Sequence, residues 1–375
     1  MKRFLFSSGL AWVILLAAFA NQPAYDHKTL EIGSAAPDFK LVGVDDREYS
    51  LASFKDARVL VIIFTCNHCP TAQCYEDRII QMTKDYAGKN VAVVAIMPND
   101  PQSLRLDELD FSDLGDSFAE MKIRAKEKNF NFPYLYDGET EVVSRAYGPI
   151  ATPHVFIFDQ DRKLRYEGRV DDTENPYKKP GQTDARNAID ALLNNREVPV
   201  KTTKVFGCSV KWSEKKDGVQ KYLDAWAKEP VHLEILETQG MESLMKNSSG
   251  KLRLLNIWSM RSDTSMQEFP EFVTINRMYR DRDFELITLC TDGAGEKEKV
   301  LKFLETCQAS NTNLQINPGD KKAWVQSVNP GWSGDLPYTL LIEPGGKIVY
   351  AKEGTIDAAE LKRTIVNNHL IGRYP

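Results

Sequence analysis

The sequence has few cysteines, no excess of basic residues and few long apolar runs, and an abundance of any one of these would have indicated a particular class of protein. It has six cysteines in 375 residues, too few for a disulfide scaffold. Its 48 Lys and Arg residues are outnumbered by 53 Asp and Glu residues, so it lacks the basic field that nucleic acid requires. Beyond the first twenty residues no 18-residue apolar run occurs, which excludes a multi-span membrane protein. The 42% hydrophobic and 27% charged residues are instead typical of a soluble globular chain of two or three domains.

The first twenty residues have the pattern of an export signal. Lys2 and Arg3 precede a mostly apolar stretch over residues 4–17, and Ala18-Phe19-Ala20 has the form of a cleavage site. An uncleaved anchor is the alternative, but the stretch is short and interrupted by small residues. We therefore expect a signal peptide over residues 1–20 and a periplasmic or secreted protein with no membrane span once the signal is removed.

The rest of the chain contains one order of elements twice. Each half has a strand, which is a continuous apolar run in the first half, then a helix, a second strand, a second helix, a hairpin and a closing helix. The expected strands are 59–64, 91–97, 153–159 and 163–166 in the first half, and 252–258, 284–291, 337–343 and 347–350 in the second. The expected helices are about 70–86, 116–128 and 184–195, then about 266–279, 297–306 and 357–368.

Strands joined by helices and ended by a hairpin predict an α/β fold with a mixed central sheet and helices on both faces. We expect two such folds in tandem, over residues 21–196 and 233–375. The segment 197–232 between them contains a predicted helix, 219–228, and is an ordered connector rather than a flexible linker.

The chemistry is predicted where the first buried strand meets its helix, at Cys66-Asn67-His68-Cys69. The unpaired N–H groups and dipole of a helix start stabilise an anion, so we expect a lowered pKa and a thiolate at Cys66. Cys69, one turn later, would close a disulfide with Cys66. Cys66 would then attack a disulfide and Cys69 would resolve the mixed intermediate. A protonated His68 would favour the Cys66 thiolate further.

Two other interpretations of the two cysteines are a zinc site and a structural disulfide. Structural zinc takes four ligands, and the sequence has no second CxxC and no nearby HxxxH, so we predict no metal and no bound cofactor. A structural disulfide stays open.

The segment from Phe64 to Cys69, with Thr152-Pro153 opening a later hairpin, resembles the thioredoxin superfamily. The resemblance implies a cis Thr152–Pro153 bond whose backbone docks substrate against Cys66, and substrate-binding roles for Asn67 and His68. An ordinary trans proline at an edge strand is the alternative. It also implies that the partner is a protein thiol or disulfide, or a small thiol.

The segment from Gly33 to Leu41 resembles the opening of the redoxin and peroxiredoxin branch, and the resemblance extends over about residues 32–195. Peroxiredoxins share a P-x-x-x-T-x-x-C segment. Counting back from Cys69, Cys66 stands in place of Thr and Ile62 in place of Pro. We therefore expect a thiol–disulfide oxidoreductase, with a thiol peroxidase and a non-enzymatic binding scaffold as the alternatives.

The second half has serine where the first has cysteine. The segment 258–265, followed by Glu268-Phe269-Pro270-Glu271, resembles the W-x-x-x-C-x-x-C…E-x-P-E segment of the TlpA-like exported thioredoxins, similar to cytochrome-maturation proteins. Ser262 and Ser265 occupy both cysteine positions, so this copy cannot exchange disulfides. Leu336-Pro337 keeps the position of the cis proline. We expect a non-redox docking module, or a structural or dimerising one.

Four cysteines lie outside the motif. Cys208, in the connector, is a possible auxiliary thiol with a resolving or relay role. We expect Cys74, Cys290 and Cys307 to be packing residues, although Cys290 is also a candidate for a lone thiol facing Ser262. The carboxylates of residues 107–116 are interpreted as a solvated acidic loop.

Overall fold

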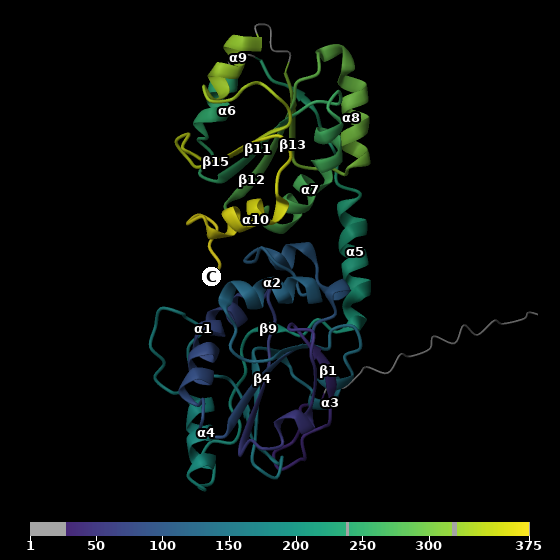
Figure 1. Ribbon diagram of the computed structural model, residues 1–375. Helices are drawn as coiled ribbons and strands as arrows, with labels where there is room; N and C mark the ends of the chain where they lie inside the picture. Colours follow the sequence, from purple (N-terminus) through teal and green to yellow (C-terminus); the bar gives the residue numbers. More distant parts are fainter. Residues whose placement is uncertain (1–27, 238–239, 317–320, 375) are drawn as a thin grey trace, which may run out of the picture.

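The computed structural model describes residues 28–237, 240–316 and 321–374, and it consists of two α/β halves stacked end to end (Figure 1). The predicted signal peptide lies outside the described residues. None of the helices within those ranges combines the length and apolar character needed to cross a membrane.

The first half is built on a seven-stranded mixed sheet of order β2-β1-β5-β4-β3-β7-β8. Its central strands β5, β4 and β3 are parallel, and β7, β8, β1 and β2 are added antiparallel. The strands are β1 Lys40–Gly43, β2 Glu48–Ser50, β3 Val59–Phe64, β4 Val91–Met97, β5 Tyr134–Tyr136, β7 His154–Phe158 and β8 Leu164–Gly168. All six residues of β3 are buried because both faces of this strand are covered, which is why it is a continuous apolar run.

Helices cover both faces of this sheet, as the sequence predicted. The helices are α1 Pro70–Asp85, α2 Phe118–Lys128, α3 Val142–Tyr147 and α4 Asp184–Leu193. Alternate residues of β3 point to opposite faces. Val61 and Ile63 pack with α1, α2 and α4, whereas Leu60 and Ile62 pack with α3.

The second half repeats this plan in a six-stranded sheet of order β10-β13-β12-β11-β14-β15. The strands are β10 Glu234–Ile235, β11 Leu252–Trp258, β12 Phe284–Cys290, β13 Thr312–Gln315, β14 Tyr338–Ile342 and β15 Ile348–Glu353. The helices are α6 Gly240–Lys246, α7 Asp263–Tyr279, α8 Lys297–Thr306, α9 Lys321–Val328 and α10 Ala358–Asn367. Helices α7, α8 and α10 pack on one face, and α6 and α9 on the other.

The terminal hairpins show how closely the two halves correspond. The register between β7 and β8 shifts at Ile157/Phe158, and the register between β14 and β15 shifts at Leu341/Ile342. Each shift lies four and five residues after the hairpin's proline, Pro153 or Pro337. This agreement supports the tandem repeat predicted from the sequence.

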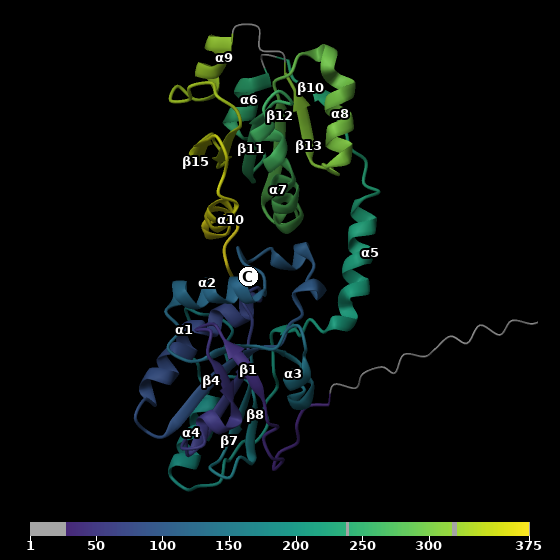
Figure 2. The same cartoon turned by 45° about the vertical axis from the view of Figure 1, so that its right-hand side comes forward.

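The connector between the sheets is ordered, as predicted. A two-residue strand, β9 Cys208–Ser209, pairs with β6 Ala151–Thr152, and α5 Lys216–Trp226 then runs along the side of the molecule toward the second half (Figure 2). The two halves also touch directly: the Tyr279 hydroxyl donates to the Ser112 carbonyl at 2.7 Å, and Arg373 binds the buried Asp113 at 2.6 Å.

Candidate functional site

The two cysteines of the motif lie at the carboxyl end of β3, in the turn that leads into α1. The helix begins at Pro70, so Cys69 is its N-cap residue, and Cys66 lies one turn before it. Both side chains are enclosed: Cys66 is 3% exposed and Cys69 is 0% exposed. The pair is therefore adjacent to the start of a helix, as predicted, but it is more deeply covered than the sequence suggested.

Thr152 lies against both sulfur atoms. Its hydroxyl is 3.0 Å from the Cys66 Sγ, and its carbonyl oxygen lies 3.4 Å from the Cys69 Sγ. The Thr152–Pro153 bond is cis, and so is the Leu336–Pro337 bond of the second half. Both cis bonds confirm the predictions.

The charge of the pair lies on Cys69 rather than on Cys66, which corrects the sequence prediction. Burial raises the pKa of Cys66 well above its usual value, and the hydrogen bond with Cys69 and the negative charge of Asp116 raise it further. Burial also opposes ionisation of Cys69, but hydrogen bonds from Cys208 and Cys66 and the charge of His68 outweigh it and lower the pKa of Cys69 well below its usual value. The physical reason is the set of neighbours, since Cys69 lies between Cys66 and Cys208 and feels the positive charge of His68.

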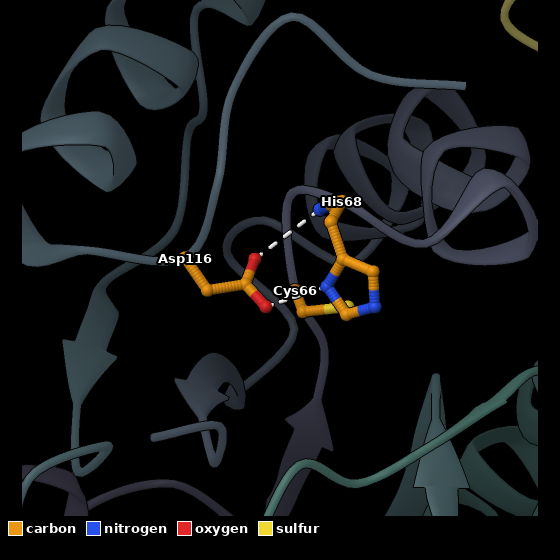
Figure 3. A group of neighbouring side chains, drawn as sticks. All are labelled: Cys66, His68 and Asp116. Carbon is orange, nitrogen blue, oxygen red and sulfur yellow. Dashed lines mark hydrogen bonds and ion pairs between the residues drawn. The ribbon is translucent and has the colours of Figure 1, made fainter. Parts of the chain in front are cut away.

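A buried carboxylate, Asp116, holds the turn between the two cysteines. One oxygen accepts hydrogen bonds from the backbone N–H groups of Asn67 at 2.9 Å and His68 at 3.2 Å, and the second oxygen accepts one from the Asn99 side chain at 2.7 Å. Its second oxygen lies 2.5 Å from Nδ1 of His68 (Figure 3). The turn that carries the cysteines is thus fixed by a side chain fifty residues further along the chain.

Asp116 and His68 form an ion pair that sets the charge of the site. Burial lowers the pKa of His68, but the neighbouring carboxylate more than compensates, and the pKa is raised. Burial acts against ionised Asp116 too, yet His68 and the donated hydrogen bonds lower its pKa. The protonated imidazole is the cation that favours a thiolate at Cys69.

The predicted substrate-binding residues divide into two groups. Thr152 and Pro153 lie beside the sulfurs, as stated above. Asn67 and His68 are both buried, and their side chains bind other groups of the protein. The Asn67 side chain donates to the Gly115 carbonyl at 2.8 Å, and His68 binds Asp116. Their direct contact with substrate stays a prediction.

Three side chains at the site could contribute metal ligands. The candidate ligand atoms of Cys66, His68 and Asp116 lie within 4.8 Å of one another (Figure 3). This is one ligand fewer than a structural zinc site requires, and Asp116 already accepts four hydrogen bonds. Nε2 of His68 is buried without a hydrogen-bond partner among the described residues. The arrangement suits a hydrogen-bonded charge pair beside a thiol.

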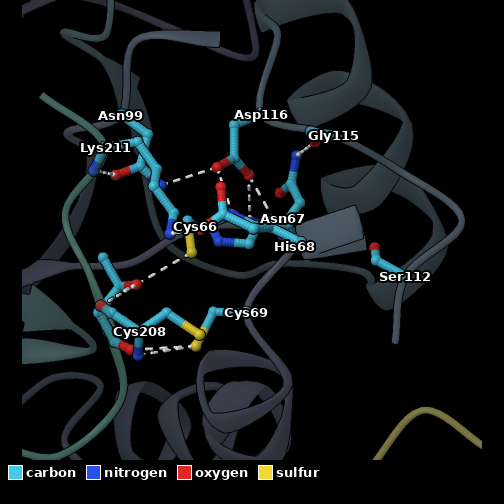
Figure 4. Close-up of polar contacts among 12 residues, drawn as sticks. Cys66, Asn67, His68, Cys69, Asn99, Ser112, Gly115, Asp116, Cys208 and Lys211 are labelled. Carbon is cyan, nitrogen blue, oxygen red and sulfur yellow. Dashed lines mark hydrogen bonds and ion pairs between the residues drawn. The ribbon is translucent and has the colours of Figure 1, made fainter. Parts of the chain in front are cut away.

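The connector reaches the site, and sequence reasoning identified only one of its residues there. The Cys208 backbone N–H donates to the Cys69 Sγ at 3.3 Å, and the Lys211 backbone N–H donates to the Asn99 side chain at 2.8 Å (Figure 4). Asn99, Lys211 and Asp116 were not predicted. Asp116 was assigned to a solvated acidic loop, which is wrong for this residue and for Asp113, since both are 1% exposed. The available signal was the Ser117…Glu120 capping box, which marks a helix start directly after Asp116.

The remaining cysteines lie away from the motif. Cys74 is buried in α1, and burial raises its pKa to about 11. Cys307 follows α8, and burial raises its pKa as well. Cys290 ends β12, and its thiol donates to Asp292 at 3.3 Å. Burial raises the pKa of Cys290, so its thiol stays protonated.

The second half keeps the geometry of the site without its thiols. Ser262 caps α7, and its hydroxyl accepts the Ser265 N–H at 3.2 Å and donates to the carbonyl of Leu336 at 3.4 Å. The contact with Leu336 corresponds to the contact of Cys69 with Thr152 in the first half. Both residues are also helix N-caps, so Ser262 is the counterpart of Cys69 and not of Cys66, as the motif comparison had placed it. A serine hydroxyl forms no disulfide, so this copy has no dithiol.

A buried carboxyl near these serines gives a testable pH dependence. Burial raises the pKa of Glu268 to about 7, only partly opposed by the Ile356 N–H that donates to it. The folded-state pKa of Glu268 lies above its unfolded-state value, so folding favours the protonated carboxyl. The contribution of this protonated group to the free energy of unfolding is complete below about pH 4.3 and is lost as the pH rises to about 7. Glu268→Gln should therefore be more stable than the wild type at pH 8, by on the order of 1 kcal/mol. Urea unfolding at pH 4.5 and pH 8 measures this, and an advantage that is equal at the two pH values would contradict it.

Parts of this chain are similar to a family model and to solved structures. Residues 31–186 match the Redoxin family model. A hypothetical protein from Sinorhizobium meliloti 1021 is 32% identical, with a TM-score of 0.44, over 50% of this chain and 97% of that protein. An uncharacterized conserved protein from Geobacillus kaustophilus is 39% identical, with a TM-score of 0.44, over 49% of this chain and 93% of that protein.

A thiol:disulfide interchange protein from Chlorobium tepidum is 18% identical, with a TM-score of 0.32, over 44% of this chain and 98% of that protein. No curated protein matches the chain. The matched segment 31–186 contains both cysteines, Asp116 and the cis proline. This segment of the chain is therefore a Redoxin domain.

Proposed function

We propose that the protein is an exported thiol–disulfide oxidoreductase that exchanges electrons through Cys66 and Cys69. The observation that carries the proposal is the arrangement of these two thiols, which both contact Thr152 beside the cis Pro153 and lie next to the His68–Asp116 pair. The Cys66 thiol donates a hydrogen bond to the Cys69 thiolate. Transfer of this proton from Cys66 to Cys69 leaves Cys66 as the thiolate, which is then the nucleophile.

The proposed reaction is dithiol–disulfide exchange. Cys66, as thiolate, attacks one sulfur of a partner disulfide, and the other sulfur of that disulfide leaves with the electron pair. Cys69 then attacks the Cys66 sulfur of the mixed disulfide, which forms the Cys66–Cys69 bond and releases the partner as a dithiol. The reverse direction oxidises a partner dithiol. The partner is a protein thiol or disulfide, or a small thiol, and the compartment is the periplasm or the exterior.

We assign the second half, over residues 233–375, a docking or structural role without redox chemistry. One contact supports a structural part of this role. Arg363 and Arg373 both bind Asp113, which lies three residues before the Asp116 that holds the cysteine turn. The second half therefore helps to fix the segment that positions the site.

The proposal is tested by mixing reduced protein with oxidised glutathione, quenching with an alkylating agent and mapping disulfides by mass spectrometry. The account predicts a Cys66–Cys69 disulfide that forms much faster than a free thiol reacts, and the same rate in Ser262→Ala. A rate no higher than that of free glutathione would refute the enzyme proposal. A faster reaction with hydrogen peroxide, leaving a sulfenate on one thiol, would favour a thiol peroxidase instead.

A further inference from the structure

A third thiol lies beside the reactive pair, and it comes from the connector. Cys208 is part of β9, which pairs antiparallel with β6 so that Cys208 lies opposite Thr152. Its backbone N–H reaches the Cys69 Sγ at 3.3 Å, and the two side chains are hydrogen bonded, with their sulfur atoms side by side in Figure 4. Cys69 is thus the middle sulfur of three, with Cys66 on one side and Cys208 on the other.

The connector is fixed on both sides of Cys208. Before it, the ring of Phe206 packs against the ring of Tyr75 in α1, with centroids 6.4 Å apart. After it, the Lys211 backbone bonds to Asn99, and the Lys211 side chain is paired with Glu108 at 2.5 Å. The position of Cys208 beside Cys69 is therefore a feature of the fold and not of a free loop.

Gly207 is what lets the connector approach so closely. Its φ is +139°, and a Cβ at this position would lie 2.1 Å from the Thr152 carbonyl oxygen, well inside van der Waals contact. A side chain here would push β9 away from β6 and take Cys208 from Cys69. Gly207 thus allows β9 to lie close to β6, and this places the next residue, Cys208, beside Cys69.

Exposure distinguishes the three thiols. Cys66 and Cys69 are buried, whereas Cys208 is partly exposed. The β6 backbone beside the sulfurs is the place where a partner strand was predicted to dock, and β9 occupies it. A partner in solution therefore meets Cys208 more readily than it meets the enclosed pair.

Resting on the proposed function, we propose that Cys208 is a third redox residue, which accepts the disulfide from the buried pair and exchanges it with the partner. Cys208, as thiolate, attacks the Cys69 sulfur of the Cys66–Cys69 disulfide. The Cys69–Cys208 bond forms, the Cys66–Cys69 bond breaks, and Cys66 leaves with the electron pair and takes up the proton that Cys208 released. One disulfide is consumed and one is formed, so the step needs no added oxidant or reductant.

The charges around Cys208 agree with this order of events. In the reduced protein, its hydrogen bond to Cys69, together with burial and the charge of Cys69, raises the pKa of Cys208 and keeps it protonated. When Cys69 is held in a disulfide, its charge is gone, and two of these three causes disappear. Cys208 then ionises more easily at the stage where it must act as the nucleophile.

The test removes Cys66 and asks where the disulfide forms. Full-length Cys66→Ser is oxidised with one equivalent of oxidised glutathione, quenched with an alkylating agent and mapped by mass spectrometry. The expected main product is an intramolecular Cys69–Cys208 disulfide. It should be absent in Cys66→Ser/Gly207→Ala and unchanged in Cys66→Ser/Cys307→Ser, the control for a second partly exposed thiol. A glutathione adduct on Cys69 with Cys208 still free would overturn the inference.

A second measurement separates this inference from the proposed function. Cys208→Ser should still form the Cys66–Cys69 disulfide, but its multiple-turnover exchange with a protein disulfide should fall about tenfold. Unchanged turnover in Cys208→Ser would overturn the role of Cys208 and leave the function intact. Failure of Cys208→Ser to form any Cys66–Cys69 disulfide, in a protein that is folded by circular dichroism, would count against the proposed function itself.

Discussion

Cys66→Ser and Cys69→Ser should each lose at least about a hundredfold in thiol–disulfide exchange, because each variant removes one sulfur of the reacting pair. The two variants should differ in their charge. The thiolate of the reduced protein lies on Cys69, whose pKa is lowered by Cys208, Cys66 and His68 against the effect of burial. The ultraviolet absorbance of a thiolate at neutral pH should therefore vanish in Cys69→Ser and persist in Cys66→Ser.

A matched control comes from the same helix. Cys74 is buried five residues after Cys69, and its pKa is raised to about 11, so Cys74→Ser should keep both the exchange rate and the thiolate absorbance. A thiolate signal that disappears in Cys66→Ser and remains in Cys69→Ser would show that the charge lies on Cys66. That result would contradict the electrostatics described above while leaving the dithiol chemistry intact.

Asp116→Asn should destabilise the reduced protein by about 3–5 kcal/mol, because it leaves a buried imidazolium without its counter-ion. The substituted amide also presents an N–H group to Asn99 and His68, which donate to Asp116 in the wild type. With the charge of His68 no longer stabilised, the pKa of Cys69 should rise. Urea unfolding and the thiolate titration measure the two effects separately.

The effect of Asp116→Asn should depend on pH in a defined window. The pKa of Asp116 is lowered by folding, so its contribution is present above the unfolded value of about 4 and is lost as the pH falls through the folded value. The pKa of His68 is raised, so its contribution is complete below about 6.5 and is lost as the pH rises through the folded value. The loss of stability should be largest between about pH 4 and 6.5.

The control for this variant is Asp107→Asn, in the same acidic segment. The Asp107 carboxylate is 23% exposed and pairs with Arg105, so its removal should cost no more than about 1 kcal/mol. Equal destabilisation by Asp107→Asn and Asp116→Asn would mean that general loss of negative charge, and not the buried pair, accounts for the effect.

Much of the fold could be predicted because its central strands are buried on both faces. Residues 59–64, 91–97 and 252–258 are strands with the predicted bounds, since a strand covered on both sides is mostly apolar. Shorter elements were missed. The strand β5, with three residues, and the helix α3, with six, are too short for a periodic pattern.

The sequence predicted those parts of the site that are formed by residues close together in the chain. The cysteine spacing and the cis proline were identified from local pattern and resemblance. Asp116 was not, because its partners Asn67 and His68 lie 49 and 48 residues away in sequence, and the neighbouring capping box marks a helix start without showing that Asp116 is buried. The lowered pKa was expected at Cys66. Burial raises the pKa of both thiols, and Cys208, which helps to lower the pKa of Cys69, lies 139 residues away in the sequence.

The most direct test of the account is the reduction potential of the Cys66–Cys69 couple in the mature protein, measured by equilibration with glutathione buffers. A reversible couple between about −270 and −120 mV is predicted for a dithiol that exchanges disulfides, with the lower end indicating a reductant and the upper end an oxidant. A potential below about −300 mV, with no detectable exchange at equilibrium, would identify a structural disulfide and contradict the proposed function.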